Sequence, residues 1–360
     1  PSINVQQIAR GFEIEEMGEE GKPVLDARGK PKVIKVEPRH AYLPRREGWV
    51  LVSTDYSFIE LCTLAQQMKR VIGYSVLAEK IAMGYDPHAY LGAQLAHGLD
   101  VDFDEACRAL GIQNPDAVYH IFMQLKVGSD EEKKFYKYWR TLAKSVGLGY
   151  PGGLGPRTFI AYAKKLYGVV VKSIEQAKSF REVWFNAFPE NREYLNRYVR
   201  DHLRDEYNST SERERFAYFT PLGCYRSRCS FTEGANGFAL QSPAAEGMKV
   251  ALFKVQRACW DPEMDSCLYG CRVNAAIHDE LLISMPNDQW LHERAFEAAR
   301  LWVEGMRVIC NEVPVKADPA AMFRWDKGAE MVLGPDERLR VWSRTENYTM
   351  DSRERLRSAT

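Results

Sequence analysis

The stretch WVLVSTDYSFIELCTLAQ, residues 49–66, decides the fold of this chain. An apolar run predicts a buried strand that ends on Asp55, and from Ile59 onward the apolar residues take on helical spacing. A buried carboxylate without a partner is costly, so an aspartate at the end of such a strand caps a turn or holds a cation. The stretch therefore predicts a strand followed by a helix, with a charged group at the junction.

A second aspartate repeats this pattern far along the chain. Asp279 follows the run VNAAIH, residues 273–278, just as Asp55 follows its strand. If the two strands share one sheet, the two carboxylates converge. Mg²⁺ binds through one or two carboxylates plus substrate phosphates, and two such ions can clamp the oxygens of an in-line phosphoryl transfer. The alternative for each aspartate is a structural turn cap.

Composition narrows the function classes only slightly. The 360 residues include 45% hydrophobic residues, which is enough for a large core and for more than one subdomain. Lysine plus arginine equals aspartate plus glutamate, 49 against 49, so any nucleic-acid surface has to be local. Neither a membrane span nor a signal peptide is recognisable, which favours a cytoplasmic protein. The eight scattered cysteines lack zinc-site spacing and indicate reduced thiols.

The order of predicted elements is sheet, helices, sheet. A hairpin is expected at 18–38, turning at about 29–31, and helices are expected over 59–98 with breaks near Gly84 and Pro87. Further predicted helices cover 102–112, 130–150, 173–209 and 242–260, and strands cover 215–231 and 271–286. This order indicates a helical domain inserted into a sheet-based one. Residues 343–360 read as a polar tail.

One predicted helix carries a cationic face. In YWRTLAKSVGLGYPGGLG, residues 138–155, Arg140 and Lys144 are four positions apart and share a helix face with Leu148. Two cations in a row could grip a triphosphate, although a solvated surface is the alternative. The glycines that follow do not form a phosphate-binding Walker loop, and they indicate a helix stop. The arginine-rich segment 181–204 leaves the same two readings open, a solvated face or a surface near a phosphate backbone.

Three motifs in this order resemble those of family A DNA polymerases, the group of bacterial DNA polymerase I, with an echo of phage members in GYPGG. DYSFIEL (55–61) is similar to the family's DYSQIELR, RTLAKSVGLGY (140–150) to its R-x3-K-x3-F-G helix, and IHDEL (277–281) to its VHDE. Weaker similarities are found in PSINVQQIAR (1–10), YDPHAY (85–90), FALQSPAAEGMKVA (238–251) and VPVKADPAAMFRWDKG (313–328). The resemblance covers about residues 1 to 330.

The resemblance implies an α+β fold, in which an antiparallel-sheet palm carries an inserted, mostly helical fingers subdomain. The palm is expected at 1–68 and 216–332, the fingers at 69–215 with the dNTP-binding helix at about 133–149, and a C-terminal extension at 333–360. The family's thumb and exonuclease domain precede the first matched segment. We therefore expect either a chain that polymerises by itself, or a fragment or split half that needs an N-terminal thumb or exonuclease partner.

The resemblance also assigns roles to residues. Asp55, the carbonyl of Tyr56 and Asp279 would hold two Mg²⁺ ions, for which Mn²⁺ could substitute, and Glu280 would be an accessory carboxylate. Glu60 would reject a ribose 2′-hydroxyl. The expected dNTP contacts also include His88, Arg140, Lys144, Leu148 and Phe58, and the expected primer and template contacts are Gln241, His278, Arg39, Tyr150 and Arg226.

Several positions depart from the family pattern. Phe58 replaces a glutamine and Cys62 an arginine of the first motif, while Leu148 replaces the ring that packs on the nucleotide sugar. A family tyrosine falls on Gly152, and Tyr150 is the nearby ring that could take its place. These changes bear on nucleotide affinity and sugar choice and leave the reaction type unaltered.

The expected function is DNA-directed DNA synthesis, in which a primer 3′-hydroxyl attacks a dNTP at a two-metal site. The expected partners are a DNA primer–template and dNTPs, with no membrane. A two-metal nuclease would use the same acidic pair, but it would leave Arg140, Lys144 and Glu60 without a role.

Overall fold

The computed structural model describes residues 12–17, 22–25 and 30–344. The chain forms two compact units, each assembled from segments distant in sequence. The first unit comprises Pro1–Ser57, Met248–Gly305 and Lys316–Thr360, and the second comprises Phe58–Gly247 and Met306–Val315.

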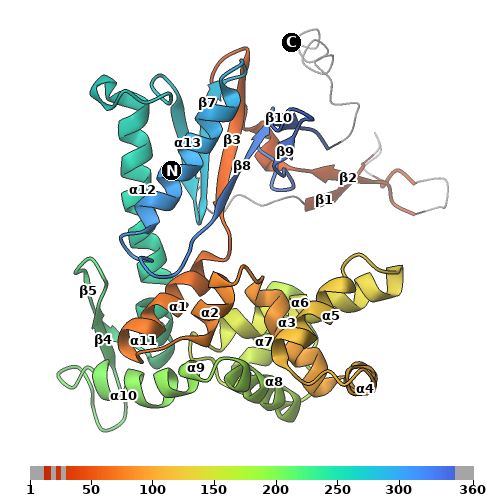
Figure 1. Ribbon diagram of the computed structural model, residues 1–360, viewed down its shortest axis with the longest axis vertical. Coiled ribbons are helices and arrows are strands. Elements are labelled where there is room, and N and C mark those ends of the chain that lie inside the picture. The colour runs from red at the N-terminus through yellow and green to blue at the C-terminus, as the bar shows by residue number, and fades with distance from the viewer. Residues whose placement is uncertain (1–11, 18–21, 26–29, 345–360) are drawn as a thin grey trace. The chain divides into compact units, whose positions relative to one another are not determined.

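A six-stranded sheet forms the centre of the first unit, with strand order β6-β7-β3-β8-β10-β9 (Figure 1). Strand β3 pairs antiparallel with both β7 and β8, and β7 pairs antiparallel with β6. The bounds of the strands are β3 Trp49–Tyr56, β6 Arg272–Ile277, β7 Glu280–Pro286, β8 Ala317–Met322, β9 Val332–Leu333 and β10 Leu339–Trp342. The predicted strand at 49–56 and the hairpin at 271–286 are therefore confirmed, and β7 separates the two strands that lead to the aspartates.

Helices α12 (Ser242–Trp260) and α13 (Leu291–Met306) lie beside this sheet (Figure 1). Tyr56 at the end of β3 stacks on Trp302 of α13, with ring centroids 5.1 Å apart, and its hydroxyl donates to the Trp302 carbonyl. The two helices approach closely because Gly305 has no side chain: a Cβ there would lie 2.2 Å from the Cα of Ala251. This packing fixes the end of β3, where Asp55 is located.

The two ends of the first unit contain further strands. β1 (Phe12–Glu15) pairs antiparallel with β2 (Val33–Val36), so a hairpin is present, but its first strand precedes the predicted range 18–38. Leu25 and Pro31 form an antiparallel bridge across the predicted turn, part of which lies outside the described residues. β10 pairs parallel with β8, which the sequence did not predict for the C-terminal extension. The similarity at residues 1–10 and most of the predicted tail, 345–360, lie outside the described residues.

The second unit is mostly helical. Its helices are α1 Ile59–Val71, α2 Val76–Ala82, α3 Pro87–Leu99, α4 Val101–Ala109, α5 Pro115–Gln124, α6 Asp130–Gly149, α7 Pro156–Tyr167, α8 Ile174–Ala187, α9 Glu190–Glu193, η3 Tyr194–Tyr198, α10 Val199–His202, α11 Phe231–Asn236 and η4 Gly237–Gln241, with strands β4 Phe216–Phe219 and β5 Tyr225–Cys229. The breaks near Gly84 and Pro87 fall where they were predicted, between α2 and α3. The sequence analysis did not predict α5, α7 or α13, although the apolar residues of α7 and α13 recur with helical spacing.

Helix α6 packs along α3 and carries the predicted cationic face. Ser129 accepts from the Glu132 backbone while the Glu132 side chain accepts from the Ser129 backbone, so a capping box fixes the start of α6. The helix ends at Gly149, and the glycines beyond it permit the close approach that was expected. A Cβ on Gly153, where φ is 77°, would lie 2.7 Å from the ring of Phe231.

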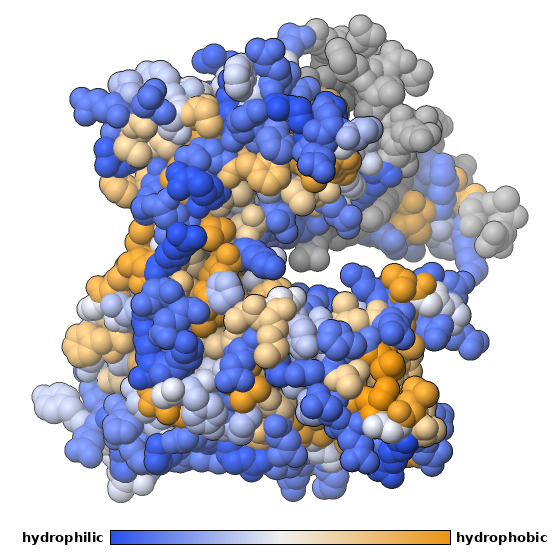
Figure 2. All heavy atoms as spheres, viewed as in Figure 1, coloured by the Kyte–Doolittle hydropathy of each residue, from blue (hydrophilic) through white to orange (hydrophobic). Residues whose placement is uncertain are grey.

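The α+β composition with an antiparallel-dominated sheet agrees with the fold class that was predicted. The palm and fingers boundaries at 68/69 and 215/216 remain predictions, since the two compact units divide at other positions. Figure 2 shows largely hydrophilic surfaces with smaller hydrophobic groups between them, and Val101 and Leu110 are among the exposed hydrophobic residues. Within the described part of the chain, no helix has the length and apolar character needed to span a membrane.

Candidate functional site

An acidic centre forms at one edge of the first unit's sheet. Asp55, at the end of β3, lies opposite Glu280 of β7 on one side and Asp318 of β8 on the other. Asp279 lies in the two-residue loop that joins β6 to β7, and its carbonyl accepts a hydrogen bond from the Tyr56 backbone N–H at 3.3 Å. The fold therefore brings Asp55, Asp279 and Glu280 together, as was expected.

The loop that carries Asp279 has a strained backbone. His278, the other loop residue, has φ of 54°, a left-handed value that is uncommon for a side chain other than glycine. Two-residue hairpin loops favour positive φ because it matches the twist of the strands. The hairpin therefore fixes where Asp279 lies, and backbone strain of this kind is often found at functional sites.

The electrostatics of the centre show an excess of negative charge. Burial, followed by the charge of Asp55, raises the pKa of Asp279 to about 6. Asp55 has one buried oxygen, Oδ1, with no hydrogen-bond partner. A carboxylate oxygen without a partner and a carboxyl whose pKa is raised by burial and by a neighbouring negative charge are both stabilised by a cation.

Lys327 supplies positive charge to this centre, and the sequence reasoning missed it. Its Nζ lies 2.7 Å from Asp55 Oδ2 and 2.9 Å from Glu280 Oε2. Burial opposes the charge of Lys327, but Asp55 and Glu280 outweigh it, so the pKa of Lys327 is raised. The nearby Trp325 Nε1 donates to Glu280 Oε1 at 3.0 Å. The available signal was the position of Lys327, two residues after the tryptophan of the last motif.

A pocket of about 300 Å³ opens beside these residues. Besides Asp55, Glu280 and Lys327, its lining includes three more acids, Asp318, Asp326 and Glu330. Asp318 was also missed from the sequence, although its place opposite Asp55 follows once β8 is recognised as the neighbour of β3. The pocket can accommodate cations and a small polar group.

The donor set fits divalent magnesium. Among the described residues, no three His, Cys, Asp or Glu side chains converge as a preformed metal cage. Mg²⁺ does not require one, because it is commonly held by one or two carboxylates with water and substrate phosphates as the remaining ligands. Asp55 and Asp279, with the Tyr56 carbonyl, are oxygen donors of that kind, and Asp55 Oδ1 has no hydrogen-bond partner that a metal would have to replace.

The second unit contains a separate cationic face on α6. Arg140 donates through Nε and Nη2 to Asp86 Oδ2, at 3.0 and 2.7 Å, while Lys144 is exposed one turn further on. Burial by itself would raise the pKa of Asp86. The charge and hydrogen bonds of Arg140 outweigh burial, so the pKa of Asp86 is lowered. Arg140 is thus paired within the protein, and Lys144 faces solvent. Leu148 follows on α6 and is half-buried.

His88 lies close to this face. It follows Asp86 at the start of α3 and is 6% exposed, with its Nδ1 buried and without a hydrogen-bond partner. Burial, together with the charges of Arg140 and Lys144, lowers the pKa of His88 to about 4, and Asp86 opposes this shift. His88 is therefore neutral at physiological pH.

Glu60, in the first turn of α1, lies close to two tyrosines of α7 that the sequence did not single out. The hydroxyls of Tyr162 and Tyr167 are 3.5 Å apart. Burial and then the Tyr162–Tyr167 hydrogen bond raise the pKa of Tyr162, and the charge of Glu60 adds to this. Phe58 directly precedes α1 with a left-handed φ of 43° and turns the chain sharply after β3.

The residues expected at primer and template divide into two groups. Gln241, Arg226 and His278 are exposed and accessible to a nucleic acid. Arg39 is 8% exposed, with its guanidinium 4.4 Å from the ring centre of Trp325. Tyr150 is fully buried, stacks on Phe159 and donates to the Ala177 carbonyl. The expectation that Tyr150 could supply a ring to the nucleotide is therefore wrong in this structure, because the helix end folds it into the core.

The arginine-rich segment pairs within its own unit. Arg192 contacts Glu182 at 2.8 Å, Arg197 contacts Glu193, and Arg200 lies 3.6 Å from Glu214. Arg181 and Arg192 also lie over the ring of Phe185. These contacts favour the solvated-face reading of the segment.

Comparison with known proteins gives one consistent relationship. The sequence pattern of DNA polymerase family A matches residues 119–327, more than half of the chain. DNA polymerase I of Helicobacter pylori is 27% identical over 200 residues, which are 52% of this chain and 19% of the relative. DNA polymerase I of Streptococcus pneumoniae is 26% identical over 256 residues (70% and 23%), and the thermostable DNA polymerase I of Thermus aquaticus is 25% identical over 289 residues (80% and 28%).

A solved structure shares the fold. It is the POL domain of Pol1 from M. smegmatis in complex with DNA primer-template and dNTP, at 24% identity and a TM-score of 0.52, covering 80% of this chain and 42% of that one. This likeness supports the expected right-hand polymerase fold. The chain spans about a fifth to a quarter of the length of the Helicobacter and Streptococcus relatives. With its family match and its shared fold, the chain belongs to DNA polymerase family A.

Proposed function

We propose that this chain catalyses template-directed transfer of a deoxynucleotide from a dNTP to a primer 3′-hydroxyl, with release of pyrophosphate. One observation carries the proposal. The sheet of the first unit places Asp55 and Asp279 at a common edge, close enough that the charge of Asp55 helps to raise the pKa of Asp279 to about 6. Such a concentration of carboxylates is costly unless cations are bound there.

Asp55 and Asp279 would hold two Mg²⁺ ions, with help from the Tyr56 carbonyl, and Mn²⁺ would substitute. Bound in this way, the ions would activate the attacking hydroxyl and stabilise the charge on the leaving oxygens. Glu280 differs from Asp55 and Asp279 in its surroundings. Its side chain is 2% exposed and pairs with Trp325 and Lys327. We assign Glu280 the role of orienting the centre.

Arg140, Lys144 and His88 would bind the triphosphate. Lys144 is exposed and ready for an anion, whereas Arg140 has to exchange Asp86 for a phosphate oxygen. His88 is neutral and can donate a hydrogen bond without adding charge. Positive groups that neutralise charge as it develops are the main catalytic contribution expected from this face.

The sugar pocket would be built around Glu60. A polar side chain packed against the sugar leaves no room for a 2′-hydroxyl, which favours dNTPs over ribonucleotides. Tyr162 and Tyr167 lie near Glu60 and would support it, and Leu148 and Phe58 would provide apolar contacts where the family has a ring and an amide. We expect these substitutions to tune substrate choice.

DNA would be contacted by exposed residues such as Gln241, Arg226 and His278. Because backbone contacts release counterions, affinity for primer–template should fall as salt rises. The face on α6 also separates this reading from a two-metal nuclease, which needs the acidic centre alone and would not require Lys144.

The direct test is extension of a labelled primer on a DNA template with Mg²⁺ and dNTPs. The wild-type chain should extend the primer and Asp55→Asn should not, while retaining its fold by circular dichroism. Asp336→Asn is the matched control, because Asp336 lies in the same unit, is exposed and pairs with Arg340. Equal extension by wild type and Asp55→Asn would refute the proposal.

A further inference from the structure

The acidic centre already contains a cation that belongs to the protein. Lys327 Nζ contacts Asp55 Oδ2 at 2.7 Å and Glu280 Oε2 at 2.9 Å. Asp55 is one of the two carboxylates that the proposed function assigns to metal. An ammonium at hydrogen-bond distance from that carboxylate repels a divalent cation that approaches the same group.

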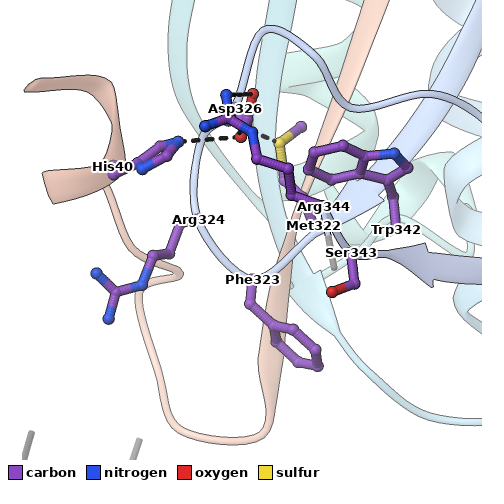
Figure 3. Close-up of a pocket in the computed structure, with 8 residues that line it drawn as sticks. All are labelled: His40, Met322, Phe323, Arg324, Asp326, Trp342, Ser343 and Arg344. Atoms are coloured by element: carbon purple, nitrogen blue, oxygen red, sulfur yellow. Dashed lines mark hydrogen bonds and ion pairs between the residues drawn. The ribbon is translucent and has the colours of Figure 1, made fainter. Parts of the chain in front are cut away.

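The backbone around Lys327 is anchored on both sides. Trp325 donates to Glu280 at 3.0 Å, and Asp326 is held by His40 Nε2 at 3.0 Å and by Arg344 Nη2 at 3.2 Å. Figure 3 shows His40 and Arg344 converging on Asp326 beside a small pocket of about 40 Å³. The Asp326 side chain also accepts from the Gly328 N–H at 2.8 Å. The backbone that carries Lys327 is therefore fixed.

The side chain of Lys327 has room to move. It is 24% exposed and lines the pocket of about 300 Å³ that also contains Asp318 and Glu330. An ammonium that leaves Asp55 therefore has other carboxylates in the same pocket. Lys327 can change partner by rotating its side chain while its backbone stays in place.

We infer that Lys327 is a tethered counter-ion that occupies the place of a divalent cation at Asp55 and is displaced when the metal binds. This inference rests on the proposed metal site. It extends the proposed function by giving the centre a means to neutralise its carboxylates without metal. The consequence is a centre with weaker affinity for divalent ions than its carboxylates alone would give.

The test measures binding of Mn²⁺ alone to the full chain, without DNA or dNTP, by titration with electron paramagnetic resonance of the free ion. Lys327→Met removes the ammonium and should tighten Mn²⁺ binding by at least about tenfold. Lys327→Arg keeps the charge and should stay within about twofold of wild type. Lys254→Met is the matched control, because Lys254 forms an equivalent ion pair with Glu304 at 2.7 Å in the same unit.

Two further variants make the result decisive. Lys327→Gln also removes the charge, but it retains a hydrogen-bond donor for the buried Glu280 and so replaces Lys327→Met if that variant fails to fold. It should tighten Mn²⁺ binding to the same extent. Asp55→Asn combined with Lys327→Gln should abolish the gain. Unchanged or weaker Mn²⁺ binding in both neutral variants would overturn the inference, as would a gain that persists without Asp55. Since no nucleotide is present, failure here is distinct from failure of primer extension.

Discussion

The two units carry charged sites of opposite sign, each with an internal partner of the other sign. In the first unit, Lys327 pairs with Asp55 and Glu280. In the second, Asp86 pairs with Arg140 beside His88. The two sites differ in how the charge that is left after this pairing is compensated.

The basic site is relieved because His88 gives up its proton, with a pKa lowered to about 4 by burial and by neighbouring cations. In the acidic centre, Lys327 is the ammonium that contacts carboxylates among the described residues, and Asp279 is left with a raised pKa. The basic face therefore carries little uncompensated positive charge before an anion binds. The acidic centre, in contrast, keeps uncompensated negative charge until a metal binds.

Among the variants that test this comparison of the two sites, the largest effect is expected at Lys144, the exposed cation of the basic face. Lys144→Ala removes a charge-assisted contact to the triphosphate and should raise the KM for dNTP on the order of 100-fold. Lys134→Ala is the control, since Lys134 is exposed on the same helix about 15 Å away and on a different face. Equal KM values for wild type and Lys144→Ala would remove α6 from nucleotide binding.

The second effect concerns the internal pairing of the acidic centre. Trp325→Phe removes the donor to Glu280 Oε1, so a buried acceptor loses its partner. The free energy of unfolding should fall by about 2 kcal/mol, measured by urea denaturation. Trp290→Phe, at an exposed tryptophan, should change it little. Similar losses in the two variants would mean that ring volume matters and the hydrogen bond to Glu280 does not.

A third, smaller effect is the pH dependence of stability that Asp279 causes without metal. Its pKa rises from 3.8 to about 6 on folding, so between about pH 4 and pH 6 the folded chain binds more protons than the unfolded chain. The contribution of this carboxyl to stability therefore falls as pH rises through that window. Asp279→Asn should remove a loss of about 1 kcal/mol per pH unit within this window, seen as the difference between the two unfolding curves. Parallel curves for variant and wild type would contradict the charge excess at the centre.

The smallest effect should come from the internal partner of the basic face. Asp86→Asn keeps a cap for the His88 and Ala89 backbone N–H groups but loses its charge, which frees Arg140 for phosphate. The affinity for dNTP should rise about threefold, because a partly exposed ion pair is weak. Weaker binding in this variant would show that Asp86 positions Arg140 for the nucleotide and does not compete for it.

Much of the acidic centre could be predicted from sequence, because strand ends and short motifs fix it. Asp55 and Asp279 follow apolar runs with period-two or buried character, and a two-residue loop leaves little freedom for Asp279. Local periodicity also located β3, α1, α6 and the hairpin of β6 and β7.

The rest could not be predicted, because it depends on contacts distant in sequence. Lys327 reaches Asp55 only because β8 lies next to β3, and the pairing of β10 with β8 gives no local signal. Tyr150 lies near the position of the family's tyrosine, yet it continues the helical backbone of α6 and its ring is buried against Phe159. Tyr162 and Tyr167 lie on α7, a helix that the sequence pattern did not reveal.

The central claim is that the acidic centre carries the chemical step of nucleotidyl transfer. It is tested most directly by single-turnover incorporation of one dNTP into a labelled primer–template, comparing wild type with Asp279→Asn and with the exposed control Asp288→Asn. Asp279→Asn should lower the rate by about a thousandfold, since metal-assisted charge stabilisation supplies several kcal/mol, with unchanged binding of primer–template. A rate for Asp279→Asn within about threefold of the control would contradict the account.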